Sequence, residues 1–234
     1  MADTPDRCLD CLVREAGLCS TIDESVLSAL SAIGRRRVLG GGQVLTWAGD
    51  ANLLCANVVS GILKITASTM NGREQIVGLL FAGDFVGQPF MEESTLTATA
   101  LVETELCLFP RERFERVLGE HQGLEHALLR RTMTSLNDAR ERMLTLGQRG
   151  AQERVAGFLL DLVDRAGSGR AAEATSFEIP ISRGDMADFL GLTIETVSRQ
   201  LTRLKGLGAI SLTRGGRSVD VNARGLLEAV ANPD

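Results

Sequence analysis

The sequence predicts an α+β protein with a β-rich N-terminal part, a long helix and a C-terminal module of short helices. Three observations indicate this fold class. Short β-rich runs alternate with glycine-containing turns between residues 35 and 109. A long helical pattern then covers Leu124–Leu146. Two short amphipathic helices separated by a glycine occupy Arg183–Lys205, and a glycine-centred hairpin follows them.

Composition limits the compartment and the partners. The chain has 234 residues, 44% of them hydrophobic, and a net charge of −5, which a general nucleic-acid coat would not carry. Residues 183–217 hold six basic residues against three acidic ones, a local charge of +3. The sequence shows no apolar run long enough to span a membrane and no secretory signal. We therefore expect a cytoplasmic protein without membrane association.

Three of the five cysteines lie close together near the N-terminus. Cys8, Cys11 and Cys19 form the pattern C-x2-C-x7-C. Two cysteines separated by two residues can direct both sulfurs at one metal ion or cluster. An odd cysteine total in a cytoplasmic chain argues against a disulfide framework. Zinc, an iron–sulfur cluster and unliganded thiols all remain open. Cys55 has apolar neighbours, so we expect it to be buried.

The region that follows is predicted to be a helix and a small sandwich or roll. Thr21–Ile33 is amphipathic, and Thr21 and Glu24 have the spacing of a capping box. Asn71–Gly72 is typical of a tight hairpin, because both central residues of that turn need positive φ. The expected strands are Ala56–Val59, Ile62–Thr66, Gln75–Leu80, Leu96–Leu101 and Leu106–Phe109.

Cys107 lies in the last of these strands. Alternation places Leu106 and Leu108 on one face, and Glu103, Glu105 and Cys107 on the other. A face with two carboxylates cannot be a dry core, so we expect the Cys107 thiol to be available to a segment lying against it. A tolerated exposed thiol is the alternative.

The long helix is predicted to mediate self-pairing. A short helix, Pro110–Leu118, and a glycine-containing break, Gly119–Gly123, precede it. Its apolar and small residues then repeat at alternating steps of three and four, as in a coiled-coil seam. Charged residues flank this seam, which favours pairing with a second copy over packing within the same chain. The seam residues are Leu129, Thr132, Leu136, Ala139, Met143 and Leu146.

The stretch Arg183–Lys205 is predicted to be two helices joined by a tight turn. Ser182 can cap the first helix, with Asp185 three residues later. Gly191 supplies a left-handed turn, and Thr193 caps the second helix. The inward face of that helix is Ile194, Val197, Leu201 and Leu204, and its polar face is Glu195, Ser198, Arg199, Thr202 and Arg203.

The surrounding elements complete a winged helix-turn-helix. A helix over Ala151–Ala166 and a strand over Phe177–Ile181 come before the two-helix stretch. Strands at Ala209–Leu212 and Ser218–Val221 form a hairpin with a basic tip, in the position of a wing. Such modules read the DNA major groove, whereas an ordinary helical hairpin with a solvated face is the alternative.

With these pieces in this order, the chain resembles the CRP/FNR superfamily of bacterial transcription regulators over nearly its full length. Gly61, the Gly72 hairpin and the AGDFVG run at Ala82–Gly87 resemble its cyclic-nucleotide-type β-roll. Leu124–Leu146 resembles its dimerisation helix, and RGDMADFLGLTIETVSRQL resembles its helix-turn-helix. The E-x-x-S-R pattern that starts at Glu195 is similar to the FNR branch. The cysteine pattern is similar to the alphaproteobacterial FnrL/FnrN type.

The resemblance implies a domain plan and a function. The plan is a cysteine-rich segment (1–20), a β-roll (21–123), a dimerisation helix (124–147) and a winged helix-turn-helix (148–234). The implied function is an oxygen-responsive regulator of anaerobic or microaerobic gene expression. It would be active as a homodimer on palindromic DNA with TTGAT-like half-sites, together with RNA polymerase, while an oxygen-labile 4Fe–4S cluster is intact.

The resemblance also assigns site residues. The cluster ligands would be Cys8, Cys11, Cys19 and Cys107. The residues expected at DNA are Arg183, Thr193, Glu195, Ser198, Arg199, Arg203, Arg214 and Arg217. Two features qualify the comparison. Residues 83–100 contain no arginine to hold a cyclic phosphate, so we expect no cAMP response. Ala139 replaces an acid that keeps some cluster-free FNR proteins monomeric, so strict coupling of dimerisation to the cluster is not implied.

Two alternative functions follow from the residues. The first is a redox or metal sensor of the same fold that uses zinc or free thiols. The second is an enzyme, for which the sequence offers no nucleophile–base constellation, no phosphate-binding glycine loop before a helix and no zinc-protease motif. We therefore predict that the protein is not an enzyme.

Overall fold

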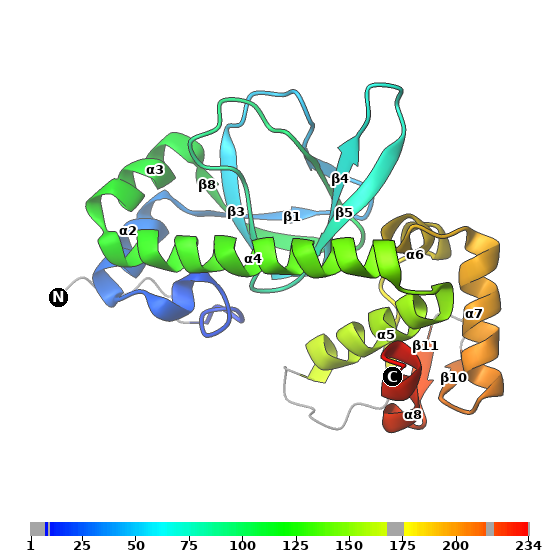
Figure 1. Cartoon of the computed structure of the whole chain (residues 1–234). Helices are drawn as coiled ribbons and strands as arrows, with labels where there is room; N and C mark the ends of the chain where they lie inside the picture. Colours follow the sequence, from blue (N-terminus) through cyan, green and yellow to red (C-terminus); the bar gives the residue numbers. More distant parts are fainter. Residues whose placement is uncertain (1–7, 9, 168–175, 214–217, 234) are drawn as a thin grey trace. The chain divides into compact units, whose positions relative to one another are not determined.

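The structure is a computed structural model that describes residues 8, 10–167, 176–213 and 218–233 (Figure 1). The chain divides into two compact units, residues 1–139 and 140–234, each of which is described by itself. The first unit contains η1 (Leu18–Thr21), α2 (Glu24–Ile33), β1 (Arg35–Leu39), β2 (Val44–Thr46), β3 (Leu54–Ser60), β4 (Leu63–Ser68), β5 (Glu74–Leu80), β6 (Phe85–Val86), β7 (Thr97–Ala100), β8 (Thr104–Pro110) and α3 (Arg111–Glu120). Helix α4 (Gln122–Gln148) begins in this unit.

The strands of the first unit form two antiparallel sheets. One has the order β1-β8-β3-β6 and the other has the order β2-β7-β4-β5. Apolar side chains from both sheets meet in one core, which includes Val58 and Leu106 from the first sheet and Leu63 and Ala98 from the second. These residues are at most 2% exposed. The fold confirms the predicted β-roll.

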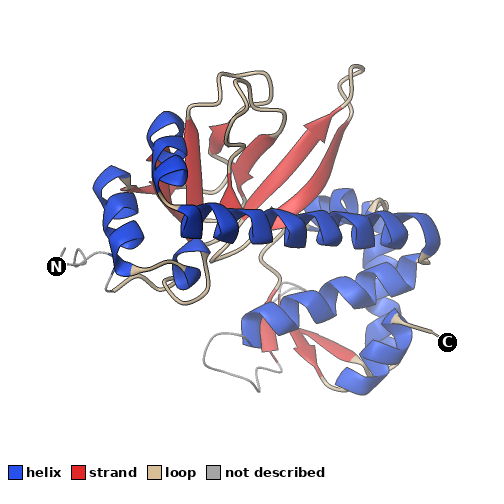
Figure 2. Ribbon diagram, turned by 60° about the vertical axis from the view of Figure 1, so that its left-hand side comes forward, coloured by secondary structure: helices blue, strands red, loops and turns tan. Residues whose placement is uncertain are grey.

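Helices cover the outer face of the first sheet. Phe109 on β8 is fully buried and packs on Phe114 of α3, with ring centroids 5.5 Å apart. Leu30 of α2 and Leu124 of α4 belong to the same cluster, together with Cys55. Figure 2 shows these helices beside the strands. Cys55 is 1% exposed, which confirms that it is buried.

This helical layer corrects the prediction for the face of β8 that carries Cys107. Leu106 and Leu108 face the inner core as expected. The opposite face is polar only at its start, where Glu105 pairs with Arg36 at 2.8 Å. It becomes apolar toward Phe109, because α2 and α3 cover that end. The half-buried Cys107 lies at the transition between the two environments.

Several element boundaries also differ from the prediction. Helix α2 is capped by Asp23, whose carboxylate accepts from the Val26 amide at 2.9 Å, whereas Thr21 ends the short helix η1. An ionised carboxylate is a good cap, since it also favours the positive helix N-terminus. The predicted break at Gly119–Gly123 is reduced to His121. The short strands β1, β2 and β6 and the last helix, α8, were not predicted.

The second unit contains α5 (Ala151–Gly167), β9 (Ser176–Glu178), α6 (Arg183–Leu190), α7 (Ile194–Gly206), β10 (Ile210–Thr213), β11 (Ser218–Val221) and α8 (Arg224–Ala231). Its strands form one antiparallel sheet with the order β10-β11-β9. The buried Leu159, Met186 and Leu201 come from α5, α6 and α7 respectively. The predicted wing strands are present, whereas the tip with Arg214 and Arg217 lies outside the described residues.

Candidate DNA interface and metal centre

The helix-turn-helix is fixed by the local signals that the sequence shows. The Asp185 amide donates to Ser182 Oγ at 3.0 Å, and the Thr196 amide donates to Thr193 Oγ1 at 3.2 Å. Gly191 has φ +62° and ends α6 in the left-handed region. A side chain there would be strained, which explains why this turn uses glycine. Both caps and the turn are confirmed.

The outer face of α7 is available to a ligand. Val197, Leu201 and Leu204 are at most 1% exposed and hold the helix against its unit. Ile194 was expected to be inward, but it is 51% exposed, since it lies at the first position of the helix. The residues Glu195, Ser198, Arg199, Thr202 and Arg203 are all exposed, as is the cap Thr193.

Two charged groups on this face suit base recognition. The guanidinium of Arg199 contacts the Thr196 hydroxyl at 3.4 Å and is otherwise presented to solvent. Hydrogen bonds from its own backbone N–H and from the Thr193 side chain lower the pKa of Glu195, so this carboxylate is ionised near neutral pH. Arginine can donate two bonds to guanine, and a carboxylate can accept from cytosine N4. Arg183 differs, because it is half-buried and burial lowers its pKa.

Arg154, which sequence reasoning missed, fastens the helix-turn-helix to the end of α4. Its guanidinium donates to the carbonyl oxygens of Leu146 at 2.8 Å, Arg149 at 2.9 Å and Leu190 at 3.0 Å. One side chain thus satisfies the last carbonyls of α4 and of α6. The interaction gives α4 a direct connection to the turn before α7.

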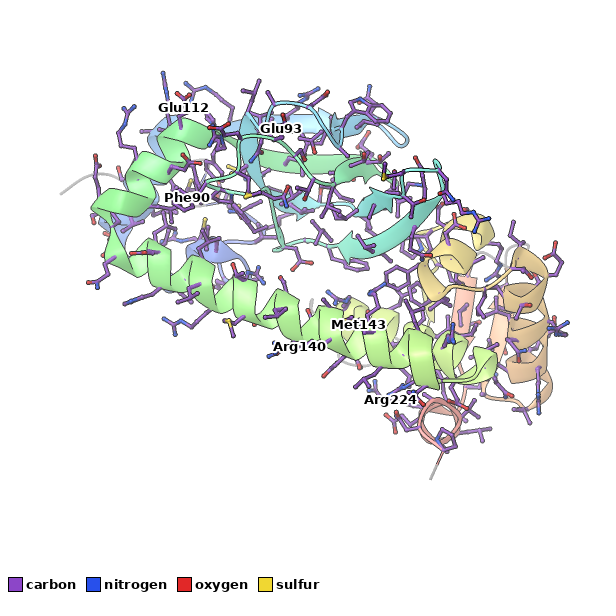
Figure 3. All side chains as sticks on the ribbon, turned by 45° about the horizontal axis from the view of Figure 1, so that its top comes forward. Phe90, Glu93, Glu112, Arg140, Met143 and Arg224 are labelled. Atoms are coloured by element: carbon purple, nitrogen blue, oxygen red, sulfur yellow. The ribbon has the colours of Figure 1, made fainter. Side chains whose placement is uncertain are left out.

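Helix α4 presents an exposed apolar stripe. Leu129, Leu136 and Met143 are 57%, 42% and 73% exposed, and Met133 is 49% exposed beside them. Figure 3 labels Met143, on the part of α4 that belongs to the second unit. Thr132 and Ala139 of the predicted seam are also exposed, whereas Leu146 is half-buried against Gly191. Large apolar side chains repeating along one helix are typical of an interface.

The four cysteines assigned as ligands line one cavity. Cys107 comes from β8, Cys19 from η1, and Cys8 and Cys11 from the segment before it. The apolar part of the lining includes Leu30 and Phe109. Residues far apart in sequence are therefore brought together, and Cys55 stays outside the group.

Burial raises the pKa of the Cys19 thiol to about 12. The nearby sulfurs of Cys107, Cys11 and Cys8 contribute in the same direction, while Arg14 opposes them. Cys19 is therefore a protonated thiol in the metal-free chain. A soft metal would have to displace that proton, and the thiolate it creates would then be stabilised by the metal.

The donor set of this cavity fits a thiolate-bound metal group. Four cysteine sulfurs suit an iron–sulfur cluster or zinc. Asn57, which is 3% exposed, lies in the same cavity, and its Oδ1 has no hydrogen-bond partner among the described residues. Among those residues, no group of three or more Cys, His, Asp or Glu is arranged to hold a metal ion directly. The chemistry therefore fits, whereas binding requires the cysteines to move closer together.

The cysteine segment is attached to α4 through Arg131. Its guanidinium donates to the carbonyl oxygen of Ala16 at 3.4 Å, and also to that of Gly83. Asp84 lies 3.6 Å from the same side chain. A Cβ built on Gly17 would be 3.3 Å from the Gly83 carbonyl, so the two backbones are in close contact. This junction was not predicted from the sequence.

A second cavity lies inside the β-roll. Its lining includes Asn52, Gln88, Ser94 and Leu96, and no charged residue is among the described residues that line it. The Asn52 amide is committed to the carbonyl oxygens of Gln88 and Met91. The prediction that cAMP is not a ligand remains a prediction.

Fold and site together define a DNA-binding regulator with an N-terminal β-roll. Residues 36–121 match the family described as the cyclic nucleotide-binding domain, and residues 153–230 match the Crp-like helix-turn-helix domain. The chain belongs to the CRP/FNR family of transcription regulators. The relatives below are named as transcription regulators rather than as enzymes.

Individual relatives cover nearly the whole chain. A probable transcriptional activator of Rhizobium leguminosarum bv. viciae is 42% identical over 89% of this chain and 87% of its own length. The transcriptional activator protein FnrL of Cereibacter sphaeroides is 38% identical over 97% and 94%. The structure of FixK2 from Bradyrhizobium japonicum has a TM-score of 0.78 and 29% identity, over 86% of this chain and 99% of that one. Within the described residues, no helix is long and apolar enough to cross a membrane.

Proposed function

We propose that this protein is an oxygen-responsive, cytoplasmic regulator of anaerobic or microaerobic gene expression. The observation that carries the proposal is the single cavity lined by Cys8, Cys11, Cys19 and Cys107. These residues would hold a 4Fe–4S cluster, and the cluster would be the part of the protein that reacts with oxygen. The names of relatives support this reading, since they include FnrL and the anaerobic regulatory protein of Haemophilus influenzae, which is 32% identical.

The chain's own residues account for the response. Gathering the cysteines orders the segment before α2, because ligands from that segment must meet Cys107 on β8. Arg131 connects the same segment to α4 through Ala16, two residues after Arg14 of the cavity lining. Arg154 connects α4 to the turn before α7. The state of the cavity would therefore influence the helix that pairs the chains and the helix that meets DNA.

Two copies would bind one palindrome. Pairing through Leu129, Leu136 and Met143 would cover the exposed stripe of α4. It would place two α7 helices about one DNA turn apart, roughly 34 Å, on TTGAT-like half-sites. Glu195, Ser198 and Arg199 would contact the bases, whereas Arg203, Arg214 and Arg217 would contact phosphates, which position the protein. As an activator, the dimer would also engage RNA polymerase, and cAMP would play no part.

The experiment is a comparison of cysteine variants in anaerobic DNA binding. Cys107→Ala should lose the difference in affinity between anaerobic and aerated protein, because it removes the only proposed ligand outside the N-terminal segment. Cys55→Ala is the matched control, since Cys55 is buried outside the cavity lining. Equal responses of Cys107→Ala and wild type would contradict the proposal.

The second candidate is a regulator that senses metal or redox state through zinc or free thiols. It is favoured by the separation of the cysteines. Among the described residues, no three or more Cys, His, Asp or Glu side chains are close enough together to hold a metal ion. Metal analysis of anaerobically purified protein distinguishes the candidates. Iron with acid-labile sulfide supports the cluster, and zinc supports a zinc site. A protein that contains neither metal supports sensing by free thiols.

A further inference from the structure

Asn57 is a buried amide in the cysteine cavity whose hydrogen-bonding capacity is only partly used. It lies on β3 directly across from Cys107 on β8, and it is 3% exposed. Its Nδ2 is 3.8 Å from the sulfur of Cys19. Its Oδ1 has no hydrogen-bond partner among the described residues.

A buried amide in this state is unusual. A buried polar atom without a hydrogen-bond partner lowers the stability of the fold, whereas an apolar residue of the same shape carries no such cost. The neighbours of Asn57 on the same face of β3 are Cys55 and Val59, which are buried and apolar. The strand could therefore accept an apolar residue at this position. The Asn57 Nδ2 group, which already faces Cys19 Sγ, is better explained by the sulfur atoms of the cavity than by the packing of the sheet.

We propose that Asn57 is a positioning residue that donates an amide N–H to the sulfur atoms of the metal group bound in this cavity, beginning with Cys19 Sγ. This inference rests on the proposed metal-binding role of the four cysteines. Hydrogen bonds to coordinating sulfur stabilise thiolate charge and raise the reduction potential of iron–sulfur groups. Asn57 thereby favours the loaded cavity and adjusts how readily the bound group is oxidised.

The test uses the full-length protein and Co²⁺ alone as the probe. Affinity is measured anaerobically by competition with a chelator, and the sulfur-to-cobalt absorption reports thiolate ligation. Asn57→Leu, which keeps the branch at Cγ and removes the donor, should weaken Co²⁺ binding about 10- to 100-fold. Asn52→Leu is the matched control, because Asn52 is equally buried at 3% exposure but lies in the β-roll cavity. It should bind Co²⁺ as wild type does.

A second pair of variants protects the test against misfolding. Asn57→Thr and Asn57→Val have nearly the same shape and both suit a strand, but only threonine has a donor. The Asn57→Thr protein should bind Co²⁺ about tenfold more tightly than the Asn57→Val protein, because threonine restores one hydrogen bond to a coordinating sulfur. Equal affinities of the two variants, or wild-type affinity of Asn57→Leu, would overturn the inference.

The reduction potential of anaerobically reconstituted protein separates this inference from the proposed function. If wild type holds a cluster, Asn57→Leu should lower its potential. An unchanged potential and affinity would refute the role of Asn57 and leave the regulator intact. If wild type binds Co²⁺ but no cluster, the cluster assignment fails, and the Co²⁺ comparison still decides the role of Asn57. A wild type that binds neither would overturn both.

Discussion

Arg131 on α4 donates a hydrogen bond to the backbone carbonyl of Ala16, which lies between Cys11 and Cys19. The same guanidinium also contacts Gly83 and Asp84 at a turn of the β-roll. The helix with the exposed apolar stripe is therefore held directly to the segment that carries three of the candidate ligands. This contact provides a physical connection between ligand binding and helix pairing.

Replacing Arg131 with alanine should weaken that connection. Hydrogen bonds to a charged donor contribute about 1.5–3 kcal/mol, so the segment around Ala16 should open more often. We expect faster amide exchange in residues 10–20 and a smaller effect of anaerobic loading on the dimer dissociation constant. Arg130→Ala, at the neighbouring exposed position, is the control. Unchanged exchange in Arg131→Ala would argue against this connection.

Replacing Leu136 with glutamate should disrupt pairing. Leu136 is 42% exposed in the single chain and lies in the middle of the α4 stripe. Two carboxylates brought into the seam of a dimer should raise its dissociation constant at least tenfold, which corresponds to about 1.4 kcal/mol. Sedimentation of the variant beside Thr134→Glu, an exposed position away from the seam, measures the effect. Similar behaviour of both variants would place the interface elsewhere.

Replacing Arg154 with alanine should lower both stability and DNA affinity. Three backbone carbonyls would lose their charged donor, which should reduce the free energy of unfolding by about 2 kcal/mol. Urea denaturation measures this change. DNA affinity should fall while sedimentation still shows the wild-type dimer, because the helix-turn-helix loses its fastening to α4. Arg154→Lys should recover only part of the lost stability and DNA affinity, since lysine lacks the planar guanidinium that donates to several carbonyls at once.

Replacing Arg199 with alanine should relax sequence recognition. A bidentate contact with guanine discriminates by about 1–3 kcal/mol, so affinities for the half-site and for a mutated half-site should converge. Arg203→Ala is the contrasting variant, because loss of a phosphate contact should weaken all sequences alike and reduce the salt dependence. If Arg199→Ala lost affinity equally for every sequence, base recognition by Arg199 would be wrong.

Local signals made much of the fold predictable. Ser182, Gly191 and Thr193 act within three or four residues of their own positions, so their roles follow from the sequence and the structure confirms them. The heptad pattern likewise identified Leu129, Leu136 and Met143, which are exposed on α4, whereas Leu146 of the same pattern is half-buried. Asp23 shows the limit of such signals, because the capping-box spacing pointed to Thr21, whereas the structure caps α2 with Asp23, two residues later.

Long-range contacts were not predictable from patterns. Arg131 and Ala16 are 115 positions apart, and Asn57 and Cys19 are 38 positions apart. Arginines on a helix normally indicate a solvated face, and only the tertiary fold shows which carbonyls they meet. The face of β8 was predicted from alternation alone. It changes character at Cys107 because α2 and α3 cover one end of the strand.

Oxygen sensing through the four cysteines can be tested with the absorption spectrum of the full chain, purified anaerobically and then exposed to air. Specific DNA binding is followed in parallel. We predict a brown protein whose broad visible band bleaches in air, with loss of specific DNA binding over the same period. A colourless anaerobic protein that binds its palindrome equally well before and after aeration would contradict the assignment of Cys8, Cys11, Cys19 and Cys107 as oxygen-sensing ligands.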